Sequence, residues 1–237
     1  MLVTGTYEKC RKYIIEHSSE SEVKKTIYPC VTISRQTGAG SYEVSEYLIN
    51  ILNDKTKGAE SRWTYFNREL LEKLLEEFNL PKVFTKYIPE DKYHHINDAV
   101  NEILGVAPSE WTVVHRSVEI ILKLAKYGKS IIVGRGSSII TSRLPNCFHI
   151  RLVAPIEKRI EHVQDVFGFV KNEALDYIKR EDERRTKYLK SHFFHNPCDE
   201  YIYHLIINTG KVSYSEAANL VAAALFRKFP NNFNQAI

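Results

Sequence analysis

Apolar residues occur along the chain either in short continuous runs or at helical spacing. Val31 to Ser34 form a β-branched run that ends at the turn-rich residues 37–41. The apolar positions that follow have the i, i+3, i+4, i+7 and i+8 spacing of a helix packed on a core: Val44, Tyr47, Leu48, Ile51 and Leu52. The pattern predicts a strand, a glycine loop and a helix in succession.

Similar patterns continue toward the C-terminus. We expect strands at 63–66, 130–133, 147–153 and 205–207, the last one buried. Helices are expected at 68–78, 93–104, 114–125, 137–142, 156–167 and 171–190. A last helix should begin at the capping box Ser213 to Glu216. Its side facing the core should be made by Leu220, Val221, Ala224 and Leu225. Short, nearly continuously apolar strands separated by helices indicate an α/β fold with a parallel sheet covered on both faces.

The first 26 residues are set apart by their pattern. Tyr7, Cys10, Tyr13 and Ile14 lie at helical spacing and are followed by a polar run, residues 17–21. We expect residues 1–26 to form a helical extension and residues 27–237 to form one main domain.

Composition narrows the function classes. The net charge of +4 suits anionic small-molecule ligands and lacks the dense basic clusters of strong nucleic-acid binders. The 4 cysteines are scattered without a C-x-x-C pair, and no signal-peptide pattern is present, so we expect a reduced, cytoplasmic setting. No apolar run approaches the roughly 20 residues that cross a bilayer, so we expect no integral membrane protein.

The glycine loop is a candidate anion site. A strand that leads through glycines into a helix gathers free backbone N–H groups and the positive end of the helix dipole. Aligned on Gly40, the Walker pattern G-x-x-x-x-G-K-[ST] would put Arg35 at the first glycine, Ser41 at the lysine and Tyr42 at the hydroxyl residue. Such a turn alone also has many purely structural uses.

Several blocks in order raise the specificity of this interpretation. They are residues 31–40 (VTISRQTGAG), 65–71 (YFNRELL), 132–137 (IVGRGS), 149–155 (HIRLVAP) and 207–209 (INT). In order and spacing, from about Ile27 to Leu225, they resemble the cytidylate-kinase-like family of P-loop nucleoside monophosphate kinases. The resemblance implies a three-layer parallel-sheet P-loop kinase fold, with a helical substrate-binding insertion at about 68–112 and a basic lid at about 171–198.

The resemblance also implies functional residues. The phosphate-binding residues would be Ser34, Gln36, Thr37, Gly38, Ala39, Gly40, Ser41 and Tyr42. The catalytic residues would be Arg35, Arg180, Asp182 and Arg185. The acceptor would be held by Asn67, Arg68 and Arg135, and a base or loop contact would come from Asn208 and Thr209. Structural alternatives stay open: a solvated, salt-bridged helix face at 179–190, a surface turn at Arg135 and a turn cap at Asn208 and Thr209.

Three positions depart from the family pattern. Ser41 and Tyr42 stand where members commonly have glycine and arginine, and Asn67 stands where they often have aspartate. The strand at 131–133 also ends without an aspartate that could bind a metal. Arg35 or a lid arginine would then have to supply the positive charge at the γ-phosphate.

Histidine spacing does not indicate a protein-bound metal. His192 with His195, the pair His94 and His95, and His115 with Glu119 each lack a third ligand at metal-site spacing. We expect magnesium to be held by nucleotide oxygens and water.

The function expected from the resemblance is ATP- and Mg²⁺-dependent phosphoryl transfer to a nucleoside monophosphate such as CMP. The partners would be small-molecule nucleotides, and we expect neither a membrane nor a nucleic acid as a partner. Whether the protein forms a homodimer stays open. A catalytically impaired nucleotide-binding or interaction module with the same fold is the alternative, because Ser41 and Tyr42 replace the usual positive charge. A nucleic-acid binder is the third class, for which no stacking-platform motif is visible.

Overall fold

The computed structural model describes residues 12–13, 27–56, 62–71 and 110–234. Its centre is a five-stranded sheet in the order β2-β3-β1-β4-β5. The strands are β1 (Cys30–Arg35), β2 (Thr64–Phe66), β3 (Ser130–Val133), β4 (Cys147–Val153) and β5 (Leu205–Asn208). All the pairs are parallel, which confirms the expected α/β class.

Strand β1 lies in the middle of the sheet. Cys30 is in register with Ser130 of β3 on one side and with Cys147 of β4 on the other. Because the strands are parallel, their carboxyl ends share one edge, and the segments that follow β1, β3 and β4 lie close together there. This edge of an open parallel sheet is where α/β proteins bind ligands.

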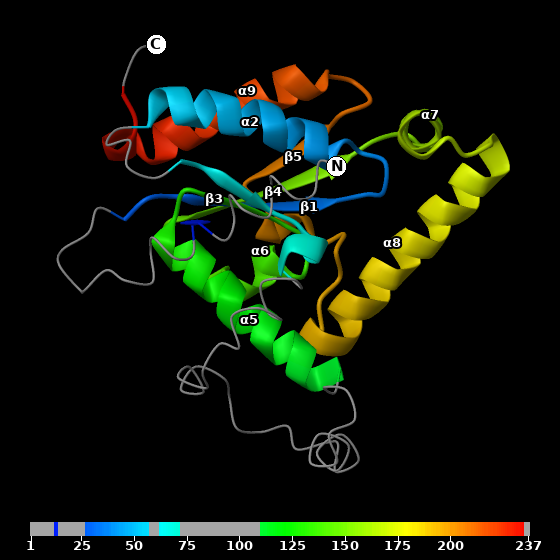
Figure 1. The fold of residues 1–237 in the computed structure, drawn as a ribbon, viewed down its shortest axis with the longest axis horizontal. Coiled ribbons are helices and arrows are strands. Elements are labelled where there is room, and N and C mark those ends of the chain that lie inside the picture. Colours follow the sequence, from blue (N-terminus) through cyan, green and yellow to red (C-terminus); the bar gives the residue numbers. More distant parts are fainter. Residues whose placement is uncertain (1–11, 14–26, 57–61, 72–109, 235–237) are drawn as a thin grey trace.

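Helices cover both faces of the sheet (Figure 1). On one face, α2 (Ser41–Lys55) packs beside α9 (Tyr214–Lys228). On the other face lie α5 (Glu110–Tyr127) and the short α6 (Ser137–Ile140). The strands β1, β3 and β4 are almost entirely buried between these layers, as expected for a parallel sheet that is covered on both faces.

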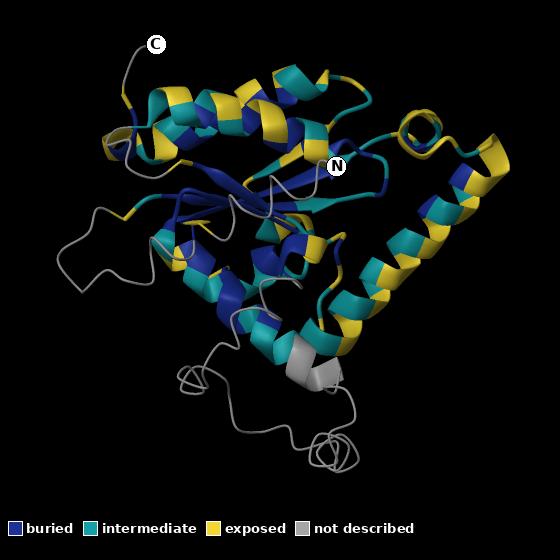
Figure 2. Ribbon diagram, viewed as in Figure 1, coloured by how far each residue is buried: buried dark blue, intermediate teal, exposed yellow. Residues whose placement is uncertain are grey.

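Helices α7 (Ile156–Phe167) and α8 (Lys171–Phe193) form a hairpin at the edge of the sheet. Their contact is a small apolar cluster of its own, made by Ile160, Val163, Ala174 and Ile178. Figure 2 shows that most of α8 is exposed or half-buried, whereas the sheet is buried. The hairpin is therefore joined to the body mainly by contacts outside the main core.

Two 3₁₀ turns, η2 (Glu200–Ile202) and η3 (Pro230–Asn232), complete the described elements. Helix α9 begins at the predicted capping box, where Ser213 Oγ accepts from the amide of Glu216 and the Glu216 carboxylate accepts from the amide of Ser213. Helix α8 runs three residues beyond its predicted end, to Phe193.

Two burial predictions were wrong. Strand β5 is an edge strand in which Ile207 is buried while Ile206 is 47% exposed, because β5 pairs on one side with β4 and no described strand covers its other side. Leu220 of α9 is 52% exposed, because the inward stripe of α9 is made by smaller residues. These are Ala217, Ala218, Val221, Ala222 and Leu225.

The helix expected at 93–104 and most of the one at 68–78 lie outside the described residues, as does most of the segment 1–26. Of that segment, Lys12 and Tyr13 are helical. Tyr13 is 3% exposed, packs edge-on against Phe66 and donates a hydrogen bond to the carbonyl oxygen of Gly128. Tyr13 is thus part of the main core.

Candidate functional site

The glycine loop, residues 36–40, connects the end of β1 to the first turn of α2. Gly38 and Gly40 have left-handed φ angles of 80° and 72°. A Cβ at Gly38 would lie 2.6 Å from the carbonyl oxygen of Arg159, and one at Gly40 would lie 2.1 Å from the ring of Tyr214. Both positions therefore need glycine for backbone conformation and for space.

The loop is braced from β4 and from the segment after β5. The Gln36 amide donates to the carbonyl oxygen of Leu152 over 3.0 Å, and the Gln36 side chain accepts from the Ala154 amide over 3.0 Å. Thr209 Oγ1 donates to the carbonyl oxygen of Ala39 over 3.1 Å. The backbone of the loop is thus fixed by segments far away in the sequence.

Asp182 of α8 contacts this loop directly. Its Oδ1 accepts from the backbone amide of Thr37 over 2.8 Å and from the Thr37 hydroxyl over 2.7 Å. Its Oδ2 accepts from Arg159 of α7 over 2.6 Å, and its Oδ1 accepts from Arg185 of α8 over 3.1 Å. Arg185 also donates to the Thr37 hydroxyl. One carboxylate therefore occupies a loop amide, a loop hydroxyl and two guanidinium groups.

Arg35 brings a further positive charge to the same place. A Cβ at Gly134 would lie 2.0 Å from Arg35 Nη1, so the guanidinium lies against the loop that follows β3. The pKa of Arg35 is lowered to about 10, chiefly by burial and also by the positive charge of Arg185, whereas Tyr65 and Asp182 oppose this shift. Arg35 is a desolvated cation beside another cation, so an anion placed there would stabilise it.

The electrostatics of this cluster favour an added anion. Burial lowers the pKa of Arg185 as well, against the opposite effects of Asp182 and Glu181. Burial would raise the pKa of Asp182, but hydrogen bonds from Thr37 and Arg159 outweigh it and leave the pKa below its usual value. The carboxylate is thus ionised at neutral pH, and its single charge is shared among several guanidinium groups.

A second group of basic side chains surrounds Arg135, in the loop between β3 and α6. Gly134, Arg135 and Gly136 have φ angles of 80°, 53° and 70°, an unusual left-handed run for which a non-glycine residue needs support. The Arg135 guanidinium lies 5.5 Å from the ring centroid of Tyr188 in α8. Burial lowers the pKa of Arg135, Tyr188 opposes this, and the charge of Arg68 lowers it further.

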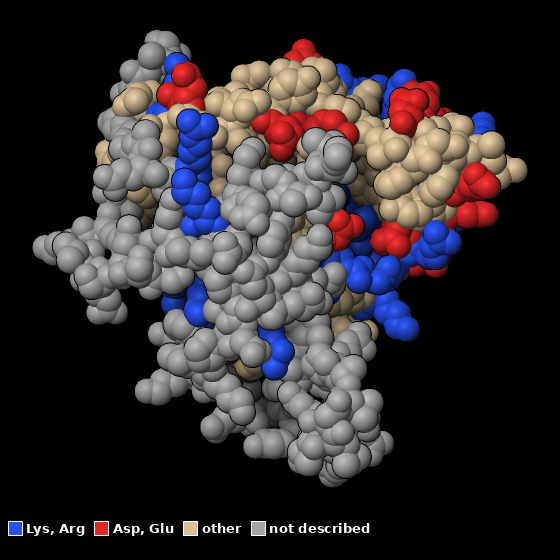
Figure 3. Space-filling model, viewed as in Figure 1, with Lys and Arg blue, Asp and Glu red and all other residues tan. Residues whose placement is uncertain are grey.

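Helix α8 thus contacts both loops with one side. Asp182 and Arg185 contact the glycine loop, and Tyr188 contacts Arg135 one turn later. A Cβ on Gly136 would lie 2.8 Å from the ring of Phe193, so this ring packs closely against the loop. Figure 3 shows Lys and Arg side chains gathered over the middle of α8, next to acidic ones.

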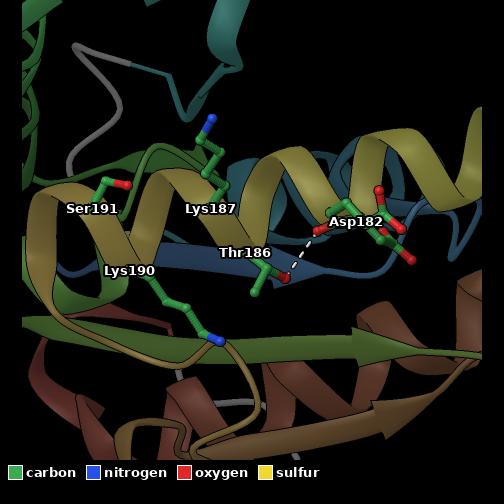
Figure 4. Close-up of a pocket in the computed structure, with 6 residues that line it drawn as sticks. Asp182, Thr186, Lys187, Lys190 and Ser191 are labelled. Carbon is green, nitrogen blue, oxygen red and sulfur yellow. Dashed lines mark hydrogen bonds between the residues drawn. The ribbon is translucent and has the colours of Figure 1, made fainter.

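A groove of about 490 Å³ runs along α8 beside this cluster (Figure 4). It is lined by Asp182, Glu183, Thr186, Lys187, Lys190 and Ser191. Thr186 Oγ1 donates to the carbonyl oxygen of Asp182 over 2.9 Å, while Lys187 and Lys190 extend in opposite directions. The two ammonium groups do not converge, so the guanidinium cluster is the better anion site.

Other residues expected in the site have structural contacts. Asn67 Oδ1 accepts from the Leu70 amide over 2.9 Å and so caps the helix that begins at Arg68. Asn208 Oδ1 accepts from the Gly210 amide over 3.0 Å, which is a turn contact at an exposed position. Arg180 is exposed and lies over the ring of Tyr177 on its own helix, 5.8 Å from the centroid.

The remaining loop positions differ in what they offer a ligand. Ser34 Oγ accepts from Arg151 over 2.9 Å. The Ser41 carbonyl oxygen accepts from Ser45 Oγ, an ordinary contact within α2. Tyr42 is 47% exposed and packs edge-on against Tyr65 at 6.1 Å, so its hydroxyl is not held on the loop by this contact.

Within the described ranges, no group of three or more His, Cys, Asp or Glu side chains could hold a metal ion. His115 Nε2 lies 3.8 Å from Glu119 Oε1, and His195 Nδ1 lies 3.8 Å from Asp199 Oδ2. His94 and His95 lie outside the described residues.

Sequence reasoning missed Arg159 and Tyr188. Arg159 lies in the first turns of α7, its Nη1 also reaches the Thr37 carbonyl oxygen at 3.4 Å, and its Nε is buried without a hydrogen-bond partner among the described atoms. Arg159 follows Pro155 by four residues, which is the one signal that could have placed it beside the sheet edge. Tyr188 is three residues after Arg185 and so lies on the same side of α8.

Known proteins resemble this chain in sequence and structure. A solved structure of an uncharacterized protein from Eubacterium ventriosum ATCC 27560 has a TM-score of 0.62 at 19% identity, over 84% of this chain and 98% of that one. Shikimate kinase from Bacteroides thetaiotaomicron has a TM-score of 0.46 at 12% identity, over 85% of this chain and 98% of that one. The first of these likenesses supports the fold.

A curated protein also matches part of the chain. It is named uronate isomerase, from Corynebacterium glutamicum, and is 29% identical over 100 residues. That match spans 42% of this chain and only 19% of the relative's length.

None of the described helices is both long and apolar enough to cross a bilayer.

The model of the cytidylate kinase-like family matches residues 30–211. This range begins with β1 and extends past β5, so it includes the glycine loop, the loop around Arg135 and both helices of the α7–α8 hairpin. The chain therefore belongs to the cytidylate kinase-like family.

Proposed function

We propose that this protein is an ATP-dependent phosphotransferase whose acceptor is a nucleoside monophosphate, CMP or a close analogue. The observation that carries the proposal is the convergence of the Thr37 amide with Arg35, Arg159 and Arg185 at the N-terminal end of α2. Phosphoryl transfer depends on positioning and on charge neutralisation, and this cluster supplies both without a lysine.

The loop residues 36–42 would bind the phosphates of ATP through backbone amides and the dipole of α2. Arg35 and Arg185 would neutralise charge on the transferred group, a role that the missing lysine has in other P-loops. Arg180 would join them when α8 moves over the nucleotide. Thr209, which is bonded to Ala39, supports the loop conformation.

The acceptor would bind on the same side of α8, farther along the helix, beside the loop that holds Arg135. The positive charge of Arg68 lowers the pKa of Arg135, and an acceptor phosphate would relieve this repulsion. Asn67, next to Arg68, and Asn208 are the amides available to a ribose or a base at this edge. Magnesium would arrive on the nucleotide, held by phosphate oxygens and water, as Mg²⁺ tolerates well.

The test is an ADP-release assay with ATP and Mg²⁺, run separately with CMP, dCMP, UMP, AMP and GMP. We expect turnover with a cytidine nucleotide above the ATPase background. No phosphorylated product with any of the five acceptors at millimolar concentration would rule the proposal out.

A pair of variants links turnover to the cluster. Arg185→Ala removes a guanidinium that contacts Thr37 and Asp182, and we expect kcat to fall about 100-fold, the usual cost of losing one stabilising donor. Lys179→Ala removes an exposed charge from the same helix and should leave kcat within about twofold. Equal effects of the two substitutions would contradict the assigned role of Arg185.

A second candidate is a nucleotide-binding module without turnover. The positions of the Walker lysine and hydroxyl residue are filled by Ser41 and by Tyr42, whose ring lies against Tyr65. This candidate predicts ATP binding without product, and no gain of activity in the double variant Ser41→Lys, Tyr42→Thr.

A further inference from the structure

The donors that a phosphate would need at the glycine loop are already bound to a carboxylate. The Thr37 amide and hydroxyl both donate to Asp182 Oδ1, at 2.8 and 2.7 Å. Arg159 donates to Oδ2 and Arg185 to Oδ1. A backbone N–H is a single donor, so the Thr37 amide cannot serve Asp182 and a phosphate oxygen fully at the same time.

We propose that Asp182 is an internal competitor that stands in for a phosphate oxyanion on the glycine loop, so that a polyphosphate ligand binds by displacing its carboxylate from Thr37 and the two arginines. The inference rests on the proposed function for the identity of the site. It goes beyond it in stating that ligand binding and the attachment of α8 to the loop exclude each other at Thr37.

Charge makes the displacement favourable. A carboxylate brings one negative charge to a cluster that contains Arg35, Arg159 and Arg185, and burial already disfavours the charged forms of Arg35 and Arg185. A polyphosphate brings several negative charges and more acceptor oxygens to the same donors. It would also meet Arg159 Nε, which is buried and has no hydrogen-bond partner among the described atoms.

The architecture allows α8 to respond. The α7–α8 hairpin has its own apolar cluster, so the hairpin keeps its internal packing when Asp182 leaves the loop. The contact between Tyr188 and Arg135 lies farther along α8 and does not depend on Thr37. Displacement at Asp182 would therefore change how the middle of α8 lies against the loop without unfolding the helix.

The test measures binding of inorganic tripolyphosphate by titration calorimetry at fixed ionic strength and pH 7.5. Asp182→Asn keeps the size of the side chain and an acceptor for Thr37 but removes the charge. We expect this variant to bind tripolyphosphate about tenfold more tightly than the wild type. It should also unfold at a lower temperature without ligand and gain more thermal stability on adding it.

Glu183→Gln is the matched control, because Glu183 is an exposed carboxylate on the same helix, adjacent in sequence to Asp182. It removes the same charge and should change tripolyphosphate affinity by less than about twofold. A role of Asp182 in folding alone would lower stability without tightening binding, so the two readouts separate the roles.

The outcomes distinguish this inference from the proposed function. Wild-type turnover together with equal or weaker tripolyphosphate binding by Asp182→Asn overturns the inference alone. Tighter binding by that variant, with no acceptor phosphorylated by the wild type, supports the inference and overturns the proposed enzyme activity. If neither protein binds tripolyphosphate at about 10 mM, the loop binds no polyphosphate and the inference fails.

Discussion

Among the buried polar side chains of the sheet, His149 affects how stability depends on pH. His149 of β4 is 4% exposed, and its Nδ1 lies 2.7 Å from Thr32 Oγ1, which in turn lies 2.9 Å from Ser138 Oγ. The ring of His204 packs beside it at 5.2 Å between centroids. The pKa of His149 is lowered to about 4, chiefly by burial and also by the neighbouring charges of His204 and Lys228.

This shift predicts loss of stability in mild acid. The unfolded chain binds a proton near pH 6.5 and the folded chain only near pH 4, so the stability present above pH 6.5 is lost as pH falls through this window. We expect His149 to account for about 2 to 3 kcal/mol of the stability lost between pH 7 and 4.5. Urea unfolding of the wild type and of His149→Gln at both pH values measures this contribution. The variant should lose less unfolding free energy between the two pH values than the wild type does.

The control is His195→Gln, which removes a half-exposed histidine from the segment after α8. Its stability should depend on pH as in the wild type, within about 0.5 kcal/mol. If His149→Gln loses as much stability in acid as the wild type does, the buried histidine is not the source.

Contacts between residues were the least predictable part of the site. The sequence placed Thr37 in a loop and Asp182 on a basic helix, but the bond between them joins positions 145 residues apart. Asp182 and Arg185 also have the spacing of an ordinary surface ion pair, so spacing alone could not show that Thr37 and Arg159 complete the group. Arg35 was identified because it replaces a glycine in a pattern where its charge is unexpected.

At the scale of elements, local patterns were reliable wherever packing followed periodicity. The start of α9 at its capping box and the strands β1, β3 and β4 were predicted correctly, because caps and apolar runs are local signals. The exposure of β5 and of Leu220 was not predictable, since it depends on which neighbours cover a strand or helix. Periodicity reports a candidate apolar face but not what covers it.

The junction of α2 and α9 gives a prediction at this scale. Gly40 and Gly168 have nearly equal φ angles of 72° and 71°, but a Cβ at Gly40 would overlap the Tyr214 ring, whereas one at Gly168 would meet nothing within 4 Å. Gly168→Ala should cost only backbone strain, about 1 kcal/mol. Gly40→Ala should cost at least about 2 kcal/mol more, because the Tyr214 ring must move. Urea unfolding of both variants measures the difference in free energy.

The movement of Tyr214 has its own readout. Its hydroxyl lies 3.2 Å from His162 Nδ1 of α7, so displacing the ring would break that contact and change the environment of His162. Equal destabilisation by the two alanine substitutions would mean that the packing of Tyr214 on the loop contributes nothing.

At the scale of the whole molecule, the described residues form two apolar cores of unequal size. The large one holds the sheet with α2, α5 and α9, and the small one holds α7 against α8. A region with few buried apolar contacts opens at a lower free energy than the main core. The sequence pattern predicted the helix at 171–190, and the resemblance predicted a lid role for it. Neither could show that polar contacts attach this helix to the body.

Hydrogen exchange tests this arrangement. Backbone amides of residues 171–193 should exchange through an opening that costs several kcal/mol less than the opening that exposes β1 and β4. Mass spectrometry of peptides from both regions over a time course gives the comparison. Protection of the α8 peptides equal to that of the β1 peptides would show that the hairpin and the sheet unfold as one unit.

The way in which the glycine loop is braced has a consequence for how the protein is made. The loop precedes its supports in the sequence: Gln36 bonds to Leu152, Ala39 bonds to Thr209, and β1 lies between strands that are translated roughly a hundred residues later. Contacts of such long sequence separation form slowly. A ribosome-bound chain from which β4 and β5 have not yet emerged should therefore carry an unformed glycine loop.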